Sequence, residues 1–248
     1  MTFSIDIREE AGVRTLLFSS EWVQGAMRIA RPWNLELEYT REMMAALLLR
    51  DAPRKVLLIG LGAASLTKFL YRHYPLAHLT VVEIEPSVVA AARQFFKLPE
   101  DPRRINLVIG DGADYVLNHD KKFDLIMVDG FDENARSGPL ETLPFYQACR
   151  GRLSDVGIIA VNLLTRSRNH VATMERLANA FDDRAMVFPS SESGNAIAFA
   201  ASGDAIEISL DDLKDNALAL KEATGLNLLP TMTRLSHSRT CLNNRLVL

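Results

Sequence analysis

Between Lys55 and Asn162 the chain alternates short apolar runs with amphipathic segments, and this alternation restricts the fold more than any other feature. Runs that are apolar throughout are typical of strands covered on both faces, and intervening helices favour parallel pairing. The expected strands are Lys55 to Gly60, Leu79 to Ile84, Ile105 to Ile109, Phe123 to Val128 and Gly157 to Asn162. The expected helices are Ser65 to His73, Pro86 to Phe96, Ala113 to Asn118 and Leu143 to Leu153. The sequence therefore predicts an α/β fold on a parallel sheet.

The segments that follow extend this sheet. A helix is expected at Asn169 to Phe181, followed by two closely spaced strands, Ala185 to Phe188 and Ala196 to Ala201. Their spacing allows an antiparallel pair at the sheet edge. By analogy, seven strands with that ending form a Rossmann-like sheet of the class I methyltransferase-like type, with helices on both faces. A tail helix, Ser209 to Ala223, is expected to be capped by Ser209 and stopped by Gly225.

The N-terminal residues predict a small β module. Short strands are expected at Phe3 to Ile7, Val13 to Phe18 and Trp22 to Ala30, and Pro32 then precedes a helical pattern from Leu35 to Arg50. We therefore expect two parts: residues 1–34 as the β module and residues 35–248 as the Rossmann-like nucleoside-binding domain with its helical tail.

Composition restricts the partners and the compartment. With 48% hydrophobic residues, 24% charged residues and a net charge of −3, the chain shows no electrostatic preference for nucleic acid or for an anionic membrane. The longest apolar stretch is too short to span a bilayer, and the N-terminus lacks the pattern of a signal peptide. The two cysteines and the scattered histidines have no metal-ligand spacing, so no metal is expected and a cytoplasmic location fits best.

A glycine turn and an acidic strand end together predict a nucleoside site. Gly60 and Gly62 follow an apolar strand and precede a helix, where they allow a sharp turn and close approach of a ligand. Glu83 ends the next strand about twenty residues after the glycines, a spacing at which a carboxylate can bind a ribose diol. The alternatives are an ordinary tight turn and a solvated strand-end charge.

A third strand end strengthens this prediction. Asp111 and Gly112, within Gly110-Asp111-Gly112, follow the third strand, where the aspartate can bind an adenine amino group, cap the next helix, or do both. A dinucleotide site is the competing interpretation. Against it, Ser65 replaces the third glycine of the dinucleotide fingerprint. An adenosyl sulfonium ligand fits better.

Two carboxylates after the fourth strand predict chemistry at the same edge. Asp129 stands where that strand emerges, and Asp132 follows three residues later. Such groups can orient an amine, remove its proton or hold a cation. The alternative for Asp132 is a turn former. The polar loop from Glu133 to Pro139 is of the kind that covers an active site.

On these motifs the chain resembles the polyamine aminopropyltransferases, the family of spermidine synthase. The resemblance runs from about Leu16 to Ala201. It rests on the glycine turn, Glu83 within Val82-Glu83-Ile84-Glu85-Pro86, Gly110-Asp111-Gly112, the Asp129-x-x-Asp132 pair, Gly138-Pro139-Leu140 and Pro144-Phe145-Tyr146. It implies that Asp129 and Asp132 activate and bind an amine, that Tyr39 replaces the family's gate tyrosine and that Gln24 lies near the donor.

Some family residues are missing, and the departures concern the aminopropyl and polyamine ends of the site. Ala63 occupies the position of the family aspartate that would hold this cation, and the family's Leu-Asp-Gly and Asp-Glu-x-x-Tyr segments are absent. A charged hydrogen bond of this kind contributes about 1.5 to 3 kcal/mol.

The leading hypothesis is transfer of an aminopropyl group from decarboxylated S-adenosylmethionine to a small amine or polyamine. The alternatives are a methyltransferase that uses S-adenosylmethionine itself and a non-catalytic nucleoside-binding relative, against which the retention of both Asp129 and Asp132 argues. The resemblance also implies a homodimer. Independently, the small N-terminal β module has too little core to shield both of its faces alone. Trp22, Val23 and Trp33 are the apolar residues expected at that interface.

Overall fold

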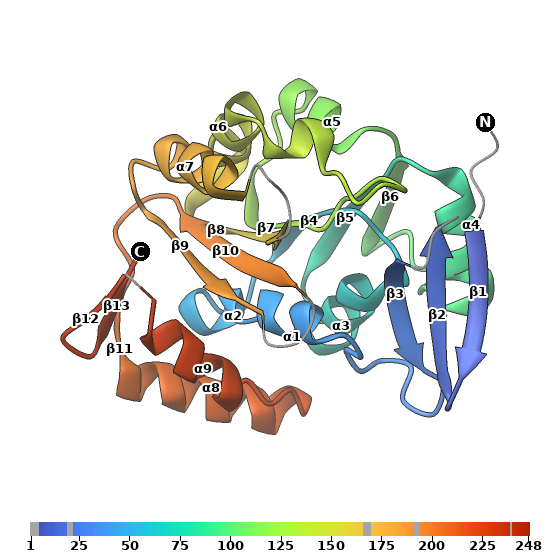
Figure 1. Cartoon of the computed structure of the whole chain (residues 1–248), viewed down its shortest axis with the longest axis horizontal. Helices are drawn as coiled ribbons and strands as arrows, with labels where there is room; N and C mark the ends of the chain where they lie inside the picture. The colour runs from blue at the N-terminus through green and yellow to red at the C-terminus, as the bar shows by residue number, and fades with distance from the viewer. Residues whose placement is uncertain (1–4, 19–21, 166–169, 191–193, 239) are drawn as a thin grey trace.

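A seven-stranded sheet with helices on both faces forms the centre of the molecule (Figure 1). This computed structural model describes residues 5–18, 22–165, 170–190, 194–238 and 240–248. The strand order is β6-β5-β4-β7-β8-β10-β9. The bounds are β4 Lys55–Ile59, β5 His78–Glu83, β6 Ile105–Ile109, β7 Phe123–Val128, β8 Leu153–Leu164, β9 Ala185–Pro189 and β10 Asn195–Ala201. The Rossmann-like fold class predicted from the sequence is confirmed.

The direction and order of the strands determine where a ligand can bind. Strands β4 to β8 pair in parallel, and β10 is antiparallel to both β8 and β9, as predicted for the sheet edge. The chain runs outward from β4 to β6 and then returns to β7 on the other side of β4. A reversal of this kind opens a crevice at the carboxyl ends of β4 and β7, the usual ligand site of open α/β sheets.

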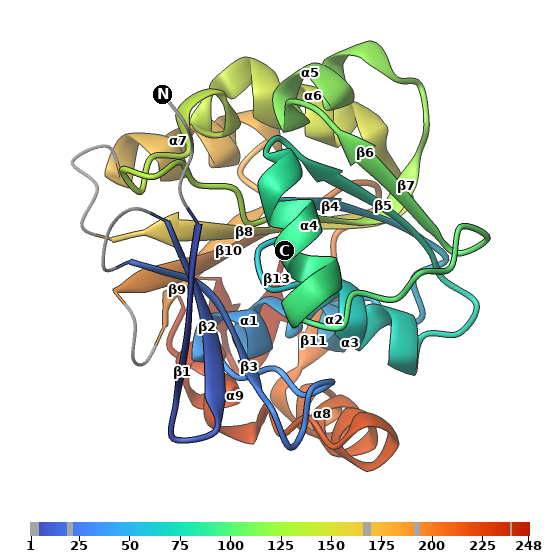
Figure 2. The same ribbon diagram turned by 90° about the vertical axis from the view of Figure 1, so that its right-hand side faces the viewer.

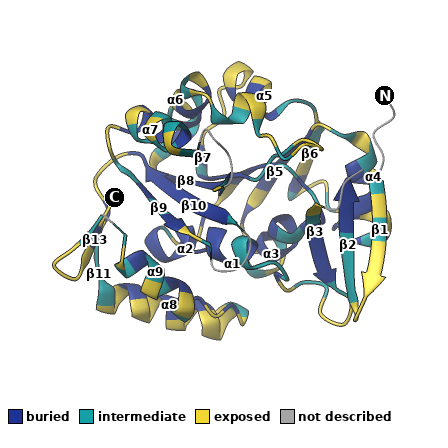
Figure 3. Ribbon diagram, viewed as in Figure 1, coloured by how far each residue is buried: buried dark blue, intermediate teal, exposed yellow. Residues whose placement is uncertain are grey.

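Side chains of alternate strand residues enter two separate cores. Along β7, Leu125 and Met127 belong to one core, and Ile126 and Val128 to the other. The helices of the larger core are α1 Glu38–Met43, α2 Ala46–Leu49, α3 Ser65–His73, α4 Pro86–Phe95, α8 Leu210–Thr224 and α9 Leu229–Ser236. The opposite face carries α5 Gly112–Asn118, α6 Leu143–Arg152 and α7 His170–Ala180, and the short 3₁₀ turn η1 Gly138–Glu141 precedes α6. Figure 3 shows the central strands buried between these layers.

A separate antiparallel sheet precedes this domain, as predicted. It contains β1 Ile5–Glu10, β2 Val13–Phe18 and β3 Val23–Arg28, and Figure 2 shows it beside the main sheet. Phe3 and Ser4, included in the expected first strand, lie outside the described residues, as does Asn169 of the expected helix before β9. The division into domains at residue 34 stays a prediction.

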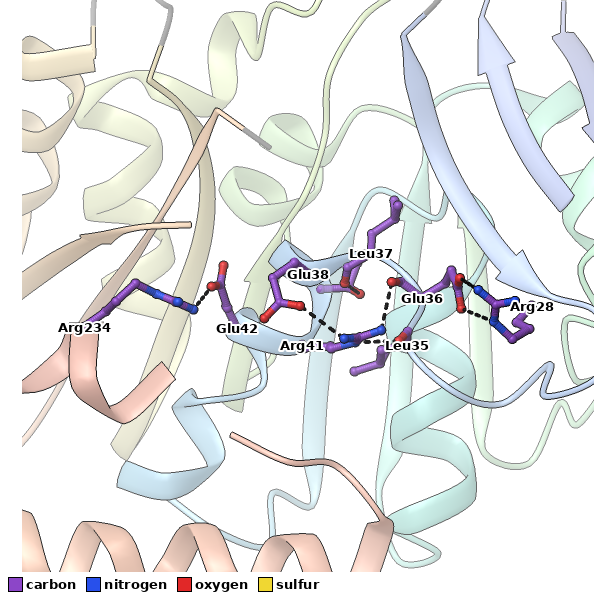
Figure 4. A network of polar contacts seen from close by, with 9 residues as sticks. Arg28, Leu35, Glu36, Leu37, Glu38, Arg41, Glu42 and Arg234 are labelled. Atoms are coloured by element: carbon purple, nitrogen blue, oxygen red, sulfur yellow. Dashed lines mark hydrogen bonds and ion pairs between the residues drawn. The ribbon is translucent and has the colours of Figure 1, made fainter. Parts of the chain in front are cut away.

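The predicted helix from Leu35 to Arg50 is replaced by two short ones, α1 and α2. The Arg41 side chain donates hydrogen bonds to the carbonyls of Leu35 and Glu36, at 2.8 and 3.0 Å, and these two residues lie before the first helical turn (Figure 4). Between the helices, the N–H groups of Met44 and Ala45 donate to carbonyls three residues back. Every side chain from Met43 to Leu49 is buried. This segment therefore has no single apolar face of the kind that a continuous amphipathic helix would show.

The C-terminal tail packs on the larger core. Ser209 caps α8 by accepting from the Asp212 N–H at 3.1 Å, and Gly225 ends it at a φ of 78°, as the sequence predicts. The tail also contains α9 and a small sheet of β11 Glu207–Ser209, β12 Cys241–Leu242 and β13 Arg245–Val247, which the sequence patterns did not predict.

No helix within the described ranges has the length and apolar character needed to cross a membrane.

Lys68 of α3 provides a test of the packing under the sheet. Its side chain is 1% exposed, and its Nζ donates to the Phe96 carbonyl, at the end of α4, at 2.9 Å. Burial, with a smaller effect from Lys97, lowers the pKa of Lys68 to about 8. The unfolded chain therefore holds more protons than the folded one between pH 8 and the ordinary lysine pKa, so stability rises with pH across that window.

We expect the free energy of unfolding of the wild type, relative to Lys68→Met, to increase by about 2 to 3 kcal/mol as the pH rises from about 7.5 to 10.5. Urea denaturation at both pH values measures the difference, and groups common to both proteins cancel. A difference that stays constant with pH would contradict the depressed pKa. Lys55→Met, at an exposed position of β4, is the matched control and should show no such change.

Candidate active site

A cavity of about 310 Å³ lies at the carboxyl ends of β4 to β7, in the crevice created by the strand order. All nine residues selected from the sequence line it: Gln24, Tyr39, Gly60, Gly62, Glu83, Asp111, Gly112, Asp129 and Asp132. Residues of the loop from Phe131 to Leu140 line it, and so do Gln24 and Gly25 of β3. The N-terminal module thus contributes directly to the cavity.

The two glycines of the turn are required by contacts within the protein. At Gly60, with a φ of 94°, a Cβ atom would lie 2.1 Å from the Asp129 carbonyl oxygen. At Gly62, a Cβ atom would lie 2.9 Å from the Gln24 carbonyl oxygen. Gly60 therefore lets β4 turn across the end of β7, and Gly62 lets β3 approach the turn. The turn leads into α3, and Ser65 and Leu66 at the start of this helix also line the cavity.

Glu83 joins two of the cavity's loops. Its Oε2 accepts from the Leu61 N–H and its Oε1 from the Glu85 N–H, both at 2.9 Å. The residue is only 8% exposed, which excludes the solvated strand-end interpretation. Burial raises the pKa of Glu83, while the backbone donors act in the opposite direction. A carboxylate oxygen can accept more than one hydrogen bond, so both oxygens retain capacity for a diol.

Asp111 and Gly112 form the start of α5. The Asp111 Oδ1 accepts from the N–H groups of Ala113 and Asp114 at 2.7 and 3.0 Å, so the aspartate is a helix cap. At Gly112 a Cβ atom would lie 2.3 Å from the Ile59 Cγ2, so a side chain there would collide with β4. The capping role is therefore present, and it leaves the carboxylate at the cavity wall.

Asp129 is the most constrained carboxylate of the cavity. Its Oδ2 accepts from the Tyr39 hydroxyl at 3.1 Å, and its Oδ1 accepts from the Asn162 Nδ2 at 2.8 Å. Burial raises the pKa of Asp129, and these two donors oppose that effect. Burial, followed by the nearby Asp129 charge, raises the pKa of Tyr39 well above its usual value. The phenol therefore stays protonated and donates to an ionisable carboxylate at neutral pH.

Asp132 differs from Asp129 in its surroundings. It is exposed, and its Oδ1 accepts from the N–H groups of Asn134 and Arg136, both at 2.8 Å. These bonds form the turn that the alternative interpretation expected. The residue also lines the cavity.

Sequence reasoning missed Asn162 and Asn195. Asn162 is a polar residue at the end of an apolar strand, and this position was the only sequence signal for it. The position of Asn195 beside it follows only from the tertiary structure.

Among the described residues, no group of three or more histidine, cysteine, aspartate or glutamate side chains is arranged to hold a metal ion.

The chain is similar in sequence to proteins of a known family. Residues 36–190 match the family model of the spermine/spermidine synthase domain. The chain is 34% identical over 224 residues to a polyamine aminopropyltransferase of Neisseria meningitidis, covering 90% of this chain and 85% of the relative. It is 37% identical over 196 residues to that of Chromobacterium violaceum, covering 79% and 75%.

Solved structures share the fold. A probable spermidine synthase from Corynebacterium glutamicum matches with a TM-score of 0.70 and 18% identity, covering 91% of this chain and 92% of that one. Human methyltransferase-like protein 13, in complex with SAH, also has a TM-score of 0.70, with 24% identity and coverage of 77% and 93%. A spermidine synthase in complex with the transition-state analogue AdoDATO matches at 0.59 and 24%, covering 80% and 74%. The sequence matches confirm the resemblance seen in the motifs: the chain belongs to the spermine/spermidine synthase family of transferases.

Proposed function

We propose that the protein transfers an aminopropyl group from decarboxylated S-adenosylmethionine to an amine acceptor. The observation that carries this proposal is the partly buried Asp129 carboxylate, held between the Tyr39 hydroxyl and the Asn162 amide at the wall of the cavity. A carboxylate with a donor on each oxygen is held in one orientation and can still accept a proton from an incoming amine.

In the proposed reaction the amine nitrogen attacks the aminopropyl carbon attached to sulfur. The carbon–sulfur bond breaks, its electron pair returns to the sulfonium, and neutral methylthioadenosine leaves. The proton lost by the amine moves to Asp129, whose carboxylate also orients the nucleophile. Most of the rate is attributed to positioning, because the sulfonium is already a good leaving group.

The nucleoside half of the cavity is proposed to hold the adenosine group. Glu83 accepts from the ribose hydroxyls, Asp111 accepts from the adenine amino group, and Gly60, Gly62 and Gly112 permit the loops that surround them. Gln24 of β3 is proposed to lie near the alkyl group of the donor.

We expect Glu83→Gln to weaken methylthioadenosine binding by about 1.5 to 3 kcal/mol, the size of a charge-assisted hydrogen-bond pair. Calorimetry measures the affinity. Glutamine is a better test than alanine because it keeps an acceptor for one of the two backbone N–H groups. Glu100→Gln, at an exposed carboxylate outside the cavity, is the control, and unchanged affinity in Glu83→Gln would contradict the ribose assignment.

Methyl transfer from S-adenosylmethionine is the second candidate, and Ala63 favours it. Ala63 is 2% exposed and packs against β3, where a Cβ atom on Gly25 would lie 2.6 Å from the Ala63 Cβ. No carboxylate therefore stands at the position where the family holds the donor's ammonium group. A structural neighbour that binds SAH shares the fold.

A screen of both donors against putrescine, cadaverine, spermidine and related amines tests the proposal. Aminopropylated product from decarboxylated S-adenosylmethionine supports it. Methylated product would favour the second candidate. Binding of methylthioadenosine with no transfer from either donor would leave a non-catalytic nucleoside-binding relative.

We also propose a homodimer formed through the β module of residues 1–34. Trp22 and Val23 are 50% and 45% exposed there, whereas the Trp33 ring is partly buried and lies 5.7 Å from the Arg72 guanidinium. The first two residues therefore suit an interface better than Trp33. Light scattering at micromolar concentration should give twice the chain mass, and a monomer mass would contradict the dimer.

The free thiols Cys149 and Cys241 support the cytoplasm as the proposed compartment.

A further inference from the structure

Three polar side chains lie side by side at the edge of the larger core, one in or directly after each of the neighbouring strands β7, β8 and β10. Asp129 directly follows β7, Asn162 lies near the end of β8 and Asn195 begins β10. Asn162 pairs with Ile197 in the antiparallel register, so Asn195, two residues before Ile197, is its diagonal neighbour on the same face of the sheet. The two asparagines are 4% and 7% exposed. Buried amides of this kind require hydrogen-bond partners.

These side chains form a directed chain of hydrogen bonds. The Asn195 Nδ2 donates to the Asn162 Oδ1 at 2.7 Å, and the Asn162 Nδ2 donates to the Asp129 Oδ1 at 2.8 Å. Because the Asn195 amino group occupies the Asn162 oxygen, Asn162 presents its own amino group to Asp129. If the Asn162 amide were reversed, its oxygen would face the carboxylate and an amino group would face another amino group. Asn195 and the Asp129 carboxylate therefore favour the same orientation of the Asn162 amide.

We propose that Asn195 is a positioning residue: through Asn162 it holds an N–H group against Asp129 and so keeps that carboxylate ionised and correctly oriented. The inference rests on the proposed role of Asp129 as the group that accepts the amine proton. A carboxylate loses this capacity when it is protonated, and hydrogen bonds to the charged form oppose protonation. With Tyr39 on the other oxygen, the relay offsets the effect of burial on the pKa of Asp129.

Other charged groups surround the same carboxylate and are unchanged in the experiment. On α1, Tyr39 contacts Asp129, and the Glu42 carboxylate one turn later is paired with Arg234 of α9. The remaining titratable groups that line the cavity are Glu83, Glu85, Asp111, Asp132 and Arg136. The alanine variants of Asn162 and Asn195 leave all of these groups in place and add no charge, so a change in the titration of Asp129 in those variants reports the relay.

The test is a pH titration of the Asp129 carboxyl carbon by NMR, with ¹³C-labelled aspartate and assignment from Asp129→Asn. We expect Asn195→Ala and Asn162→Ala each to raise the apparent pKa of Asp129 by about one unit. The double variant should match Asn162→Ala alone, because Asn195 acts only through Asn162. Asn106→Ala, at an exposed position of β6, should leave the titration unchanged.

A second variant guards against loss of packing in the alanine proteins. Asn195→Asp keeps the shape, but its ionised carboxylate only accepts, so it draws the Asn162 amino group away from Asp129 and adds a negative charge that acts in the same direction. We expect a larger rise in the apparent pKa of Asp129 than in Asn195→Ala. An unchanged titration in both Asn195 variants, or additive shifts in the double variant, would overturn the proposal.

The titration needs no substrate, so it separates this inference from the proposed reaction. In an active enzyme, the acid limb of the kcat/KM profile should move upward in Asn195→Ala by the same amount as the NMR titration. If the wild type transfers the aminopropyl group but the Asp129 titration is unchanged in the variants, the relay is refuted and the proposed reaction stands. A shifted titration without transfer by the wild type would support the relay and refute the reaction.

Discussion

Aminopropyl transfer by Asp129→Asn is expected to be slower than that of the wild type by about a hundredfold or more, the usual contribution of a general base. Asparagine keeps the shape of the side chain and an oxygen that can accept from Tyr39 or Asn162, but it removes the negative charge and the proton acceptor. Binding of methylthioadenosine should survive, because the proposed nucleoside contacts come from Glu83 and Asp111. Single-turnover kinetics and calorimetry measure the two quantities separately.

The pH dependence of the wild type adds a second criterion. Burial raises the pKa of Asp129, so its carboxylate becomes protonated at a higher pH than an ordinary aspartate. Activity is therefore expected to fall as the pH decreases through this raised pKa. Tyr39→Phe removes one donor, which should shift this acid limb further upward. Asp215→Asn, at an exposed position of α8, is the control for the loss of one charge. Turnover retained in Asp129→Asn would exclude Asp129 as the base.

The sequence predicted the cavity well because its chemistry lies at the ends of consecutive parallel strands. Such ends meet at one edge of a sheet whatever the details of packing, so Glu83, Asp111 and Asp129 could be placed together from their spacing alone. The glycines were identified correctly as turn residues. The structure adds that a side chain at Gly60 would collide with the Asp129 carbonyl.

Features that depend on distant pairing escaped prediction. Asn162 and Asn195 lie on antiparallel strands, and their contact depends on a register that no local pattern specifies. The last strands, such as Cys241–Leu242, are too short for an alternation of side chains to be recognised. The break between α1 and α2 also depends on tertiary packing, because an apolar run buried on all sides has no helical period to detect.

The ion pair between Glu42 and Arg234 shows the same dependence on tertiary structure. It joins α1 to α9, and Figure 4 shows it beside the bonds of Arg41 and the pair of Arg28 with Glu36. The Glu42 side chain is 0% exposed and that of Arg234 is 22% exposed. Glu42 follows Tyr39 by three residues, so the pair anchors the helix that places the phenol against Asp129.

We expect Arg234→Met to lower the free energy of unfolding by about 3 to 5 kcal/mol, because it leaves the Glu42 carboxylate buried without its cation. The double variant Glu42→Gln with Arg234→Met should recover most of this loss, since removing both charges removes the desolvation penalty as well. Arg245→Met is the matched control: its pair with Glu207 spans 3.8 Å with both side chains more than half exposed, and such pairs contribute about 0 to 1 kcal/mol. Urea denaturation at low and high salt measures all three, and only the exposed pair should weaken appreciably with salt. Equal small losses for Arg234→Met and Arg245→Met would show that the tail does not depend on this pair and that α1 is held in place by apolar packing alone.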